Sequence, residues 1–188
     1  HAPVPETWRP TDWAGGLREH WPGGEAAAET RLRHFIAQDL PRYAADRDRP
    51  DRDATSRLSP HLAFGEISPF QLWHAAGAAE GSAGARNVGK FLSELGWREF
   101  SWHLLFHFPE LPTRNFQPRF DAFPWRQPGE ELAAWQRGRT GVPIVDAGMR
   151  QLWNTGWMHN RVRMIVASFL VKNLLIDWRI GESWFWDT

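Results

Sequence analysis

Hydrophobic side chains recur at helical spacing over two long stretches, and this periodicity restricts the fold more than any other feature. Between residues 86 and 108, and again from 159 to 176, apolar residues return about every 3.6 positions. No alternating apolar and polar pattern longer than four residues occurs, so a sheet would have no candidate strands. We therefore predict an all-α fold.

Shorter helices are predicted in the first half of the chain. Residues 26–40 carry one apolar stripe, which Pro41 would disturb. Ser68 followed by Pro69 provides an N-cap and a first turn for another helix. A glycine-bounded break is expected over residues 77–84.

The second half contains two further predicted helices. Pro143 opens one that Gly156 closes, and residues 130–137 indicate a short one. The proline- and aromatic-rich segment 111–128 has no period. Residues 46–57 alternate acidic and arginine side chains without an apolar face, which predicts a solvated loop unless a ligand orders it.

The length of 188 residues suits one domain. The first 25 residues, rich in proline and glycine, are interpreted as a linker from an absent N-terminal domain, with order beginning near Ala26. Residues 26–188 would then form a partial helical domain, cut from a longer polypeptide at both ends. The chain lacks a secretion signal and an apolar stretch of membrane-spanning length, so we expect a monomeric, cytoplasmic protein without membrane contact.

Composition excludes several kinds of site. The chain has no cysteine, which rules out disulfides, zinc knuckles and thiol nucleophiles within these residues. His103 and His107 are spaced as metal ligands could be, but packing on an aromatic helix is the preferred interpretation, and no metal site is predicted. The thirteen tryptophans are interpreted mainly as packing residues, with an aromatic function for some.

Charge predicts a nucleic-acid contact only where basic residues cluster. The 22 basic and 22 acidic side chains cancel over the whole chain. Between residues 139 and 179, however, six basic side chains are accompanied only by Asp146 and Asp177. These basic residues are Arg139, Arg150, Arg161, Arg163, Lys172 and Arg179. Interleaved with aromatic residues, they predict a nucleic-acid-binding patch, with a solvated helix face as the alternative.

Three short segments carry polar groups that could bind a ligand. Residues 55–59 place three hydroxyls and a guanidinium together, which suits phosphate binding or a capped turn. Glu94, Trp97 and Arg98 share one helix face, either as a surface ion pair of Glu94 with Arg98 or as groups that bind a base. Residues 157–164 form the densest group, with Asn160, Arg163 and Met164 on one side.

Four motifs together resemble the photolyase and cryptochrome family. They are TSRLSPHL at 55–62, WREF at 97–100, TGVPIVDAGMRQ at 140–151 and TGWMHNRVR at 155–163. The resemblance is greatest to class I cyclobutane pyrimidine dimer photolyases. It implies an all-helical FAD-binding domain that follows an α/β antenna domain, with the antenna chromophore held by that absent domain.

The resemblance also assigns roles to individual residues. Residues implied to bind FAD are Tyr43, Thr55, Ser56, Arg57, Leu58, Ser59, Phe91, Arg98 and Arg163. Residues implied to contact DNA are Arg47, Glu94, Trp97, Arg98, Trp157, Asn160 and Arg161. Glu94, Asn160 and Met164 would line the pocket for the dimer. Trp125 and Trp178 would belong to an electron-transfer chain whose third member would lie beyond Thr188.

The implied function is light-driven repair of cyclobutane pyrimidine dimers in DNA by reduced FAD. Glu94 would hydrogen-bond the dimer and Trp97 would stack beside it. A cryptochrome-type blue-light photoreceptor is the first alternative, because it uses the same pocket. A non-catalytic helical nucleic-acid-binding module is the second, because the basic patch alone would allow it.

Overall fold

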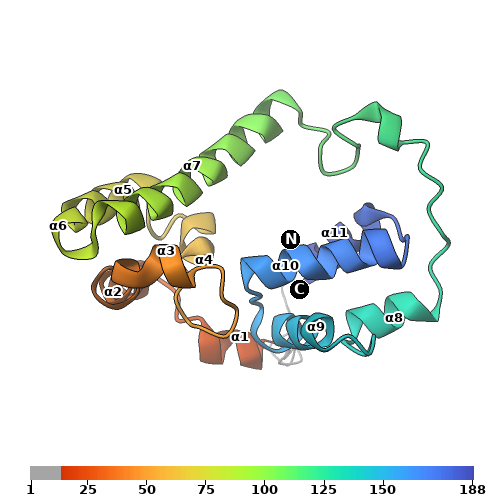
Figure 1. Ribbon diagram of the computed structural model, residues 1–188, viewed down its shortest axis with the longest axis horizontal. Coiled ribbons are helices and arrows are strands. Elements are labelled where there is room, and N and C mark those ends of the chain that lie inside the picture. Colours follow the sequence, from red (N-terminus) through yellow and green to blue (C-terminus); the bar gives the residue numbers. More distant parts are fainter. Residues whose placement is uncertain (1–13) are drawn as a thin grey trace, which may run out of the picture.

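The computed structural model describes residues 14–188, and these are helical without any strand, as the sequence predicts. Figure 1 shows the order of the elements. The first group comprises α1 (Gly15–His20), α2 (Glu25–His34), η1 (Phe35–Asp39), η2 (Leu40–Arg42), α3 (Tyr43–Asp46), α4 (Ser59–Ala63), α5 (Pro69–Ala78), α6 (Glu80–Ala83) and α7 (Ala85–His107). The second comprises η3 (Pro118–Phe120), α8 (Glu130–Gln136), α9 (Pro143–Thr155), α10 (Asn160–Ser168), η4 (Phe169–Asn173) and α11 (Trp178–Asp187). Predictions that fall on residues 1–13 lie outside the described residues.

Two separate hydrophobic cores divide the helices into an N-lobe (residues 25–107) and a C-lobe (residues 130–187). In the N-lobe, the ring of Phe35 lies 4.7 Å from that of Phe91 and 5.6 Å from that of Tyr43. Aromatic edge and tilted contacts of this kind add to the stabilisation from burial. The length alone, which suits one domain, does not indicate this division into two cores.

The C-lobe core forms around Trp135 of α8, which is fully buried. Its indole nitrogen donates a hydrogen bond to the Val166 carbonyl at 3.1 Å, so the one polar atom of the ring is satisfied. Gly148 lets α9 approach α10 closely, because a Cβ at this position would lie 2.4 Å from Cγ1 of Val162. Small side chains at such crossings set how near two helices can pack.

Several predicted boundaries are confirmed. The long helix expected over 86–108 is α7, and the Pro143 helix is α9, which ends at Gly156 in a left-handed conformation. Ser68 forms a full capping box with Gln71 at the start of α5.

Other predictions need correction. The helix expected over 159–176 ends as α10 at Ser168 and continues as the π-helical turn η4, after which Leu175 has a φ of 57°. The break expected over 77–84 contains the short helix α6. The prediction that ordered structure begins near Ala26 is also wrong. Before that residue, α1 packs on α9, and the Trp21 indole nitrogen donates to the Thr155 carbonyl at 2.6 Å.

The second half of α7 lies beyond the N-lobe core. Its last buried residue is Leu95, and the helix continues to His107, from where residues 108–129 lead round to α8 (Figure 1). Large side chains here are exposed, including Trp97, Phe106 and Trp102. Trp135 alone among the described tryptophans is fully buried, whereas Trp73, Trp97, Trp102, Trp153 and Trp186 are exposed and the rest are half-buried.

Replacing Gly148 by alanine should destabilise the protein by about 1–3 kcal/mol, because the added methyl overlaps Val162 at the α9–α10 crossing. Gly77→Ala in α5 is the matched control, since nothing lies within 4 Å of the added methyl there. That control should be neutral or stabilising by up to about 1 kcal/mol, from helix propensity. Urea denaturation measures both; equal effects would contradict this account of the crossing.

Candidate functional site

The carboxylate of Glu94 is held from two sides. It accepts a hydrogen bond from Nη1 of Arg47 and lies 3.2 Å from Nζ of Lys90, one turn earlier on α7. The Glu94 side chain keeps 28% of its surface exposed. The ion pair with Arg98, one of the two alternatives for this helix face, does not form. Arg98 instead pairs with Glu99 and lies over the ring of Trp102.

Arg47 is buried, with 8% of its surface exposed. Its guanidinium lies 5.7 Å from the centre of the Tyr43 ring, and its Nε lies 3.4 Å from Oδ1 of Asp48. Its side chain therefore faces Glu94 and Asp48 rather than solvent, and the DNA contact implied for Arg47 stays a prediction. Burial raises the pKa of Tyr43 to about 12, against the opposing charge of Arg47, so this phenol stays protonated.

Asp48 connects Arg47 of the N-lobe to the C-lobe. Its Oδ1 accepts a hydrogen bond from Nε of Arg161 at 2.9 Å. A continuous set of ion pairs thus connects α7 with α10, and we call it the relay. It consists of Lys90, Glu94, Arg47, Asp48 and Arg161. The relay brings the Glu94 segment and the Asn160 segment to one place, although they are far apart in the sequence.

The start of α10 is fixed by its neighbours. Nδ1 of the buried His159 accepts a hydrogen bond from the backbone nitrogen of Arg161 at 3.1 Å. Burial lowers the pKa of His159, which favours the neutral ring that this acceptor role requires. Nη1 of Arg161 lies 3.5 Å from Sδ of Met164. Asn160 and Met164 are exposed, as is Trp97 on α7, so all three are available to a ligand.

The hydroxyl segment 55–59 connects the lobes a second time. Arg57 has a φ of 53°, and its guanidinium lies 4.5 Å from the centre of the Trp157 ring. The carbonyls of Thr55 and Ser56 accept hydrogen bonds from Arg31, at 2.8 and 2.7 Å. A non-glycine residue with positive φ is uncommon and persists only where its surroundings hold it.

The side-chain hydroxyls of this segment are largely free. Those of Thr55 and Ser59 make no hydrogen bond to any described residue, and the side chain of Ser56 accepts only a 3.4 Å bond from the Leu58 nitrogen. No side chain caps α4. The alternative of a capped turn is therefore not supported, and these groups remain available to a ligand.

Arg163 presents a cation without a carboxylate partner. Its guanidinium lies 4.9 Å from the centre of the Phe185 ring, and it forms no ion pair with a described residue. Burial lowers its pKa, so an anion beside it would be stabilising. Leu58 and Phe91, in contrast, are buried in the N-lobe core, so their side chains offer little surface for a cofactor.

Trp125 and Trp178 lie on the same side of the C-lobe. Both line one hollow of about 450 Å³ together with Lys172 and Leu175. The indole nitrogen of Trp178 donates to Oδ1 of Asn115 at 2.8 Å.

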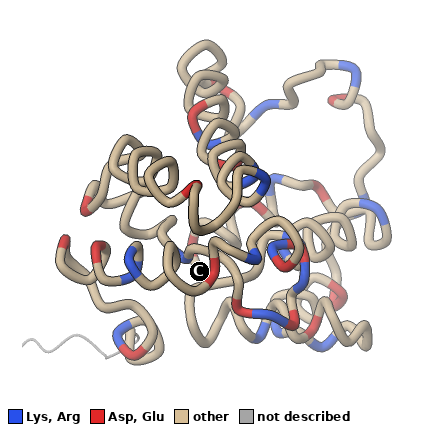
Figure 2. The backbone as a smooth tube through the Cα atoms, turned by 60° about the vertical axis from the view of Figure 1, so that its left-hand side comes forward, with Lys and Arg blue, Asp and Glu red and all other residues tan. Residues whose placement is uncertain are grey.

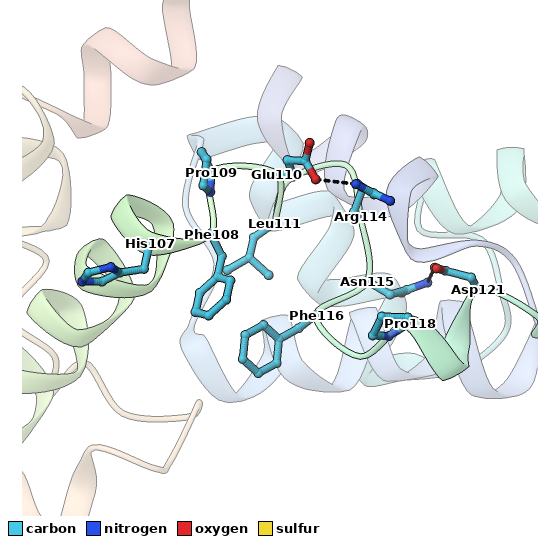
Figure 3. A pocket seen from close by; sticks show the side chains of 10 residues that line it. All are labelled: His107, Phe108, Pro109, Glu110, Leu111, Arg114, Asn115, Phe116, Pro118 and Asp121. Atoms are coloured by element: carbon cyan, nitrogen blue, oxygen red, sulfur yellow. Dashed lines mark hydrogen bonds and ion pairs between the residues drawn. The ribbon is translucent and has the colours of Figure 1, made fainter.

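A second hollow, of about 420 Å³, lies where α7 ends and is lined by Phe108 and other residues of 107–121 (Figure 3). Neither hollow includes a relay residue.

The predicted basic patch is only partly present. Figure 2 shows basic and acidic positions interspersed along the backbone. Arg161 is paired with Asp48, and Arg179 is paired with Asp177 at 2.9 Å. Arg139 and Arg150 line a different hollow, between α8, α9 and α11. The six residues therefore do not act as one surface.

His103 and His107, interpreted as packing on an aromatic helix, do make ring contacts there, although not within a core. Both are exposed, and their rings contact each other with centroids 4.4 Å apart. The described residues contain no group of three or more side chains placed to hold a metal ion. Within residues 14–188, none of the helices has the length and apolar character needed to cross a membrane.

Sequence reasoning missed three residues of the site. Asp48 lies in the charged segment 46–57, which was expected to be solvated, and only the folded chain reveals its partner Arg161. Lys90 lies one helical turn before Glu94, and that spacing was a usable signal. His159 belongs to a quoted motif, yet its buried position gives it a role that no spacing rule indicates.

The geometry defines an all-helical ligand-binding domain that offers a held carboxylate, exposed aromatic rings, free hydroxyls and an unpaired guanidinium. A profile described as the FAD binding domain of DNA photolyase matches residues 91–188. A deoxyribodipyrimidine photo-lyase from Agrobacterium fabrum is 55% identical over 94% of the chain and 37% of its own length. The chain belongs to the DNA photolyase family and carries the family's FAD-binding domain.

Other relatives include both branches of this family. The Escherichia coli deoxyribodipyrimidine photo-lyase is 50% identical over 88% of the chain and 36% of its own length, and Arabidopsis thaliana cryptochrome-1 is 42% identical over 92% and 26%. The solved structure of a bacterial class III photolyase from Agrobacterium tumefaciens, 54% identical, superposes with a TM-score of 0.91 over 94% of the chain and 37% of its own. The resemblance to class I in particular is not confirmed. The chain spans between a quarter and two-fifths of these relatives.

Replacing Arg161 by glutamine should raise the pKa of Asp48, because the hydrogen bond from Arg161 is the largest cause that lowers it. The contact between the lobes is therefore present above the ordinary aspartate pKa of 3.8, and it is lost as pH falls through the lowered value. A carbon-13 NMR titration of the carboxylates measures the shift. Arg49→Gln, whose partner is Asp51, should leave Asp48 unchanged; equal shifts in both variants would refute the contact.

Proposed function

We propose that the protein repairs cyclobutane pyrimidine dimers in DNA with light and reduced FAD. The observation that carries this proposal is the Glu94 carboxylate, held by Arg47 next to exposed Trp97 on the same helix. The relay brings this helix face near Asn160 and Met164 of α10. A carboxylate, an indole ring and an amide suit a ligand with hydrogen-bonding base edges and flat faces.

The residues present fit FAD. The cofactor carries two phosphates, a ribose and a ring system that becomes anionic when fully reduced. The free hydroxyls of Thr55 and Ser59 can donate to phosphate or ribose oxygens, and Arg57 stands between them in sequence. Arg163 supplies a partly buried cation that has no carboxylate partner among the described residues. Tyr43 and Arg98 complete the group that we propose to hold FAD.

When bound, reduced FAD supplies a light-driven electron for the cleavage of the two bonds that join the bases. The chain's own residues orient the dimer and stabilise the negative charge that it then carries. Glu94 hydrogen-bonds the base edge, and Arg47 fixes the direction of that carboxylate. Because Arg47 is itself buried and paired, the carboxylate is already oriented before the substrate arrives.

Photolyases are among the enzymes known to turn their target nucleotide out of the duplex. Trp97, 62% exposed, offers a ring face on which the displaced bases can stack. Arg161 and Trp157 lie near Asn160 at the start of α10. There Arg161 can exchange its partner Asp48 for a DNA phosphate. We assign Trp125 and Trp178 to electron transfer toward oxidised flavin, since both line one hollow.

A cryptochrome-type photoreceptor is the alternative function, because cryptochromes are also among the relatives. The photo-lyases from Agrobacterium fabrum and Escherichia coli are the more similar sequences, at 55% and 50% identity against 42% for cryptochrome-1. We further propose that the protein acts in the cytoplasm as a monomer, with an antenna chromophore bound by a domain outside this chain. Light scattering would test the monomer.

Glu94→Gln should lower the rate of light-dependent dimer repair by about tenfold or more, because a charged hydrogen bond contributes about 1.5–3 kcal/mol. The assay follows loss of dimers from an irradiated oligonucleotide under blue light. Glu29→Gln, on the surface of α2, should leave the rate unchanged. If the wild-type protein binds FAD but repairs no dimers in light, the photoreceptor alternative is favoured.

Arg163→Gln should reduce the amount of FAD retained after gel filtration, because it removes the unpaired cation. The flavin absorption bands of the eluted protein measure occupancy. Arg33→Gln serves as the control, since Arg33 is exposed and pairs with Glu29 on α2. Equal retention in wild type and both variants would remove Arg163 from the cofactor site, and no retention even by the wild type would contradict FAD binding by this chain.

A further inference from the structure

A hollow on the C-lobe combines arginines with stacked tryptophans, and the proposed repair function does not use it. It has a volume of about 310 Å³ and lies between α8, α9 and α11. It is lined by Gln136, Arg137, Arg139, Met149, Arg150, Trp153, Asn154 and Trp184. None of these residues belongs to the relay or to the group assigned to FAD.

The charge of the hollow is entirely positive. Three arginines line it and no carboxylate does. Arg137 and Arg139 form no hydrogen bond or ion pair through their side chains with any described residue. Arg150 donates to the Gly138 carbonyl at 2.6 Å, which fixes its direction, and its charge also acts on the Asp146 carboxylate outside the hollow. Arg137 and Arg139 therefore lack a counter-charge among the described residues, and an anion bound beside them would supply one.

Two indole rings form one wall of the same hollow. Trp153 of α9 and Trp184 of α11 stack with an interplanar angle of 6° and centroids 5.7 Å apart. Trp153 nevertheless keeps 67% of its surface exposed. The stack fixes the orientation of Trp153 and leaves most of its surface available for a planar ligand.

We propose that this hollow binds a ligand that carries both an aromatic ring and a phosphate group, as a nucleoside monophosphate does. The ring stacks on Trp153, and the phosphate bonds to Arg137 and Arg139. Guanidinium groups bind phosphate oxygens through pairs of parallel hydrogen bonds, which suits an anion with several equivalent oxygens. The volume lies at the lower end of small-molecule sites and limits the ligand to about the size of one nucleotide.

Tryptophan fluorescence and calorimetry with AMP as the probe test this site. The purified protein should bind AMP saturably, with quenching of indole emission, and adenosine or inorganic phosphate alone should each bind at least tenfold more weakly. Arg137→Gln with Arg139→Gln should weaken AMP binding by tenfold or more, and Trp153→Leu should remove most of the quenching.

Matched controls separate this site from the rest of the molecule. Arg33→Gln and Trp186→Leu, an exposed arginine and an exposed tryptophan outside the hollow, should bind AMP as the wild type does. Arg163→Gln should also bind AMP normally, which distinguishes the hollow from the FAD site. Thermal denaturation confirms that each variant is folded.

Several results would overturn the proposal. If phosphate binds as tightly as AMP, the hollow is a simple anion site. If a single-stranded oligonucleotide binds there and AMP does not, the surface serves nucleic acid rather than a small ligand. If AMP binding survives loss of both arginines, or if the wild type does not bind AMP, the assignment is wrong.

Discussion

The buried guanidinium of Arg47 is the interaction on which the candidate site depends. A charge removed from water is tolerated only where it is paired, and Arg47 meets that requirement with Glu94 on α7 and with Asp48 beside it. Asp48 in turn holds Arg161 of the other lobe. Because the two lobes have separate cores, polar contacts of this kind, and not a shared apolar layer, bring the Glu94 carboxylate toward α10.

The division into two cores also explains where polar groups are left free. Each lobe satisfies its own apolar packing, as Phe35 and Trp135 show at the centres of their clusters. The groups between the lobes therefore need not be apolar, and they include hydroxyls, a carboxylate and cations. A polar ligand can enter such a boundary without displacing core side chains. This arrangement is consistent with a domain that binds a large cofactor and a nucleic acid.

Much of the fold, and less of the site, could be predicted from the sequence. Periodicity and end signals located α7 and α9 because these helices depend on local chemistry such as the proline at residue 143. The π-helical turn η4 was not predicted, because a segment of five residues is too short for its apolar spacing to distinguish a π-helical turn from α-helix. The motif at 155–163 contains Asn160, and helical spacing placed Glu94 on one face with Trp97. The burial of Arg47 depends on tertiary contacts, and a charged side chain in a polar segment is ordinarily expected in solvent.

The length of α7 past its last buried residue has a mechanical consequence. Twelve residues separate Leu95 from His107, which corresponds to about 18 Å of helix. Trp97 lies only about 3 Å beyond the same point. If the helix tilts about Leu95, the far end sweeps about six times the distance that Trp97 moves. Whatever docks on the outer part of α7 can therefore shift that end by a large amount while the exposed ring of Trp97 stays nearly in place.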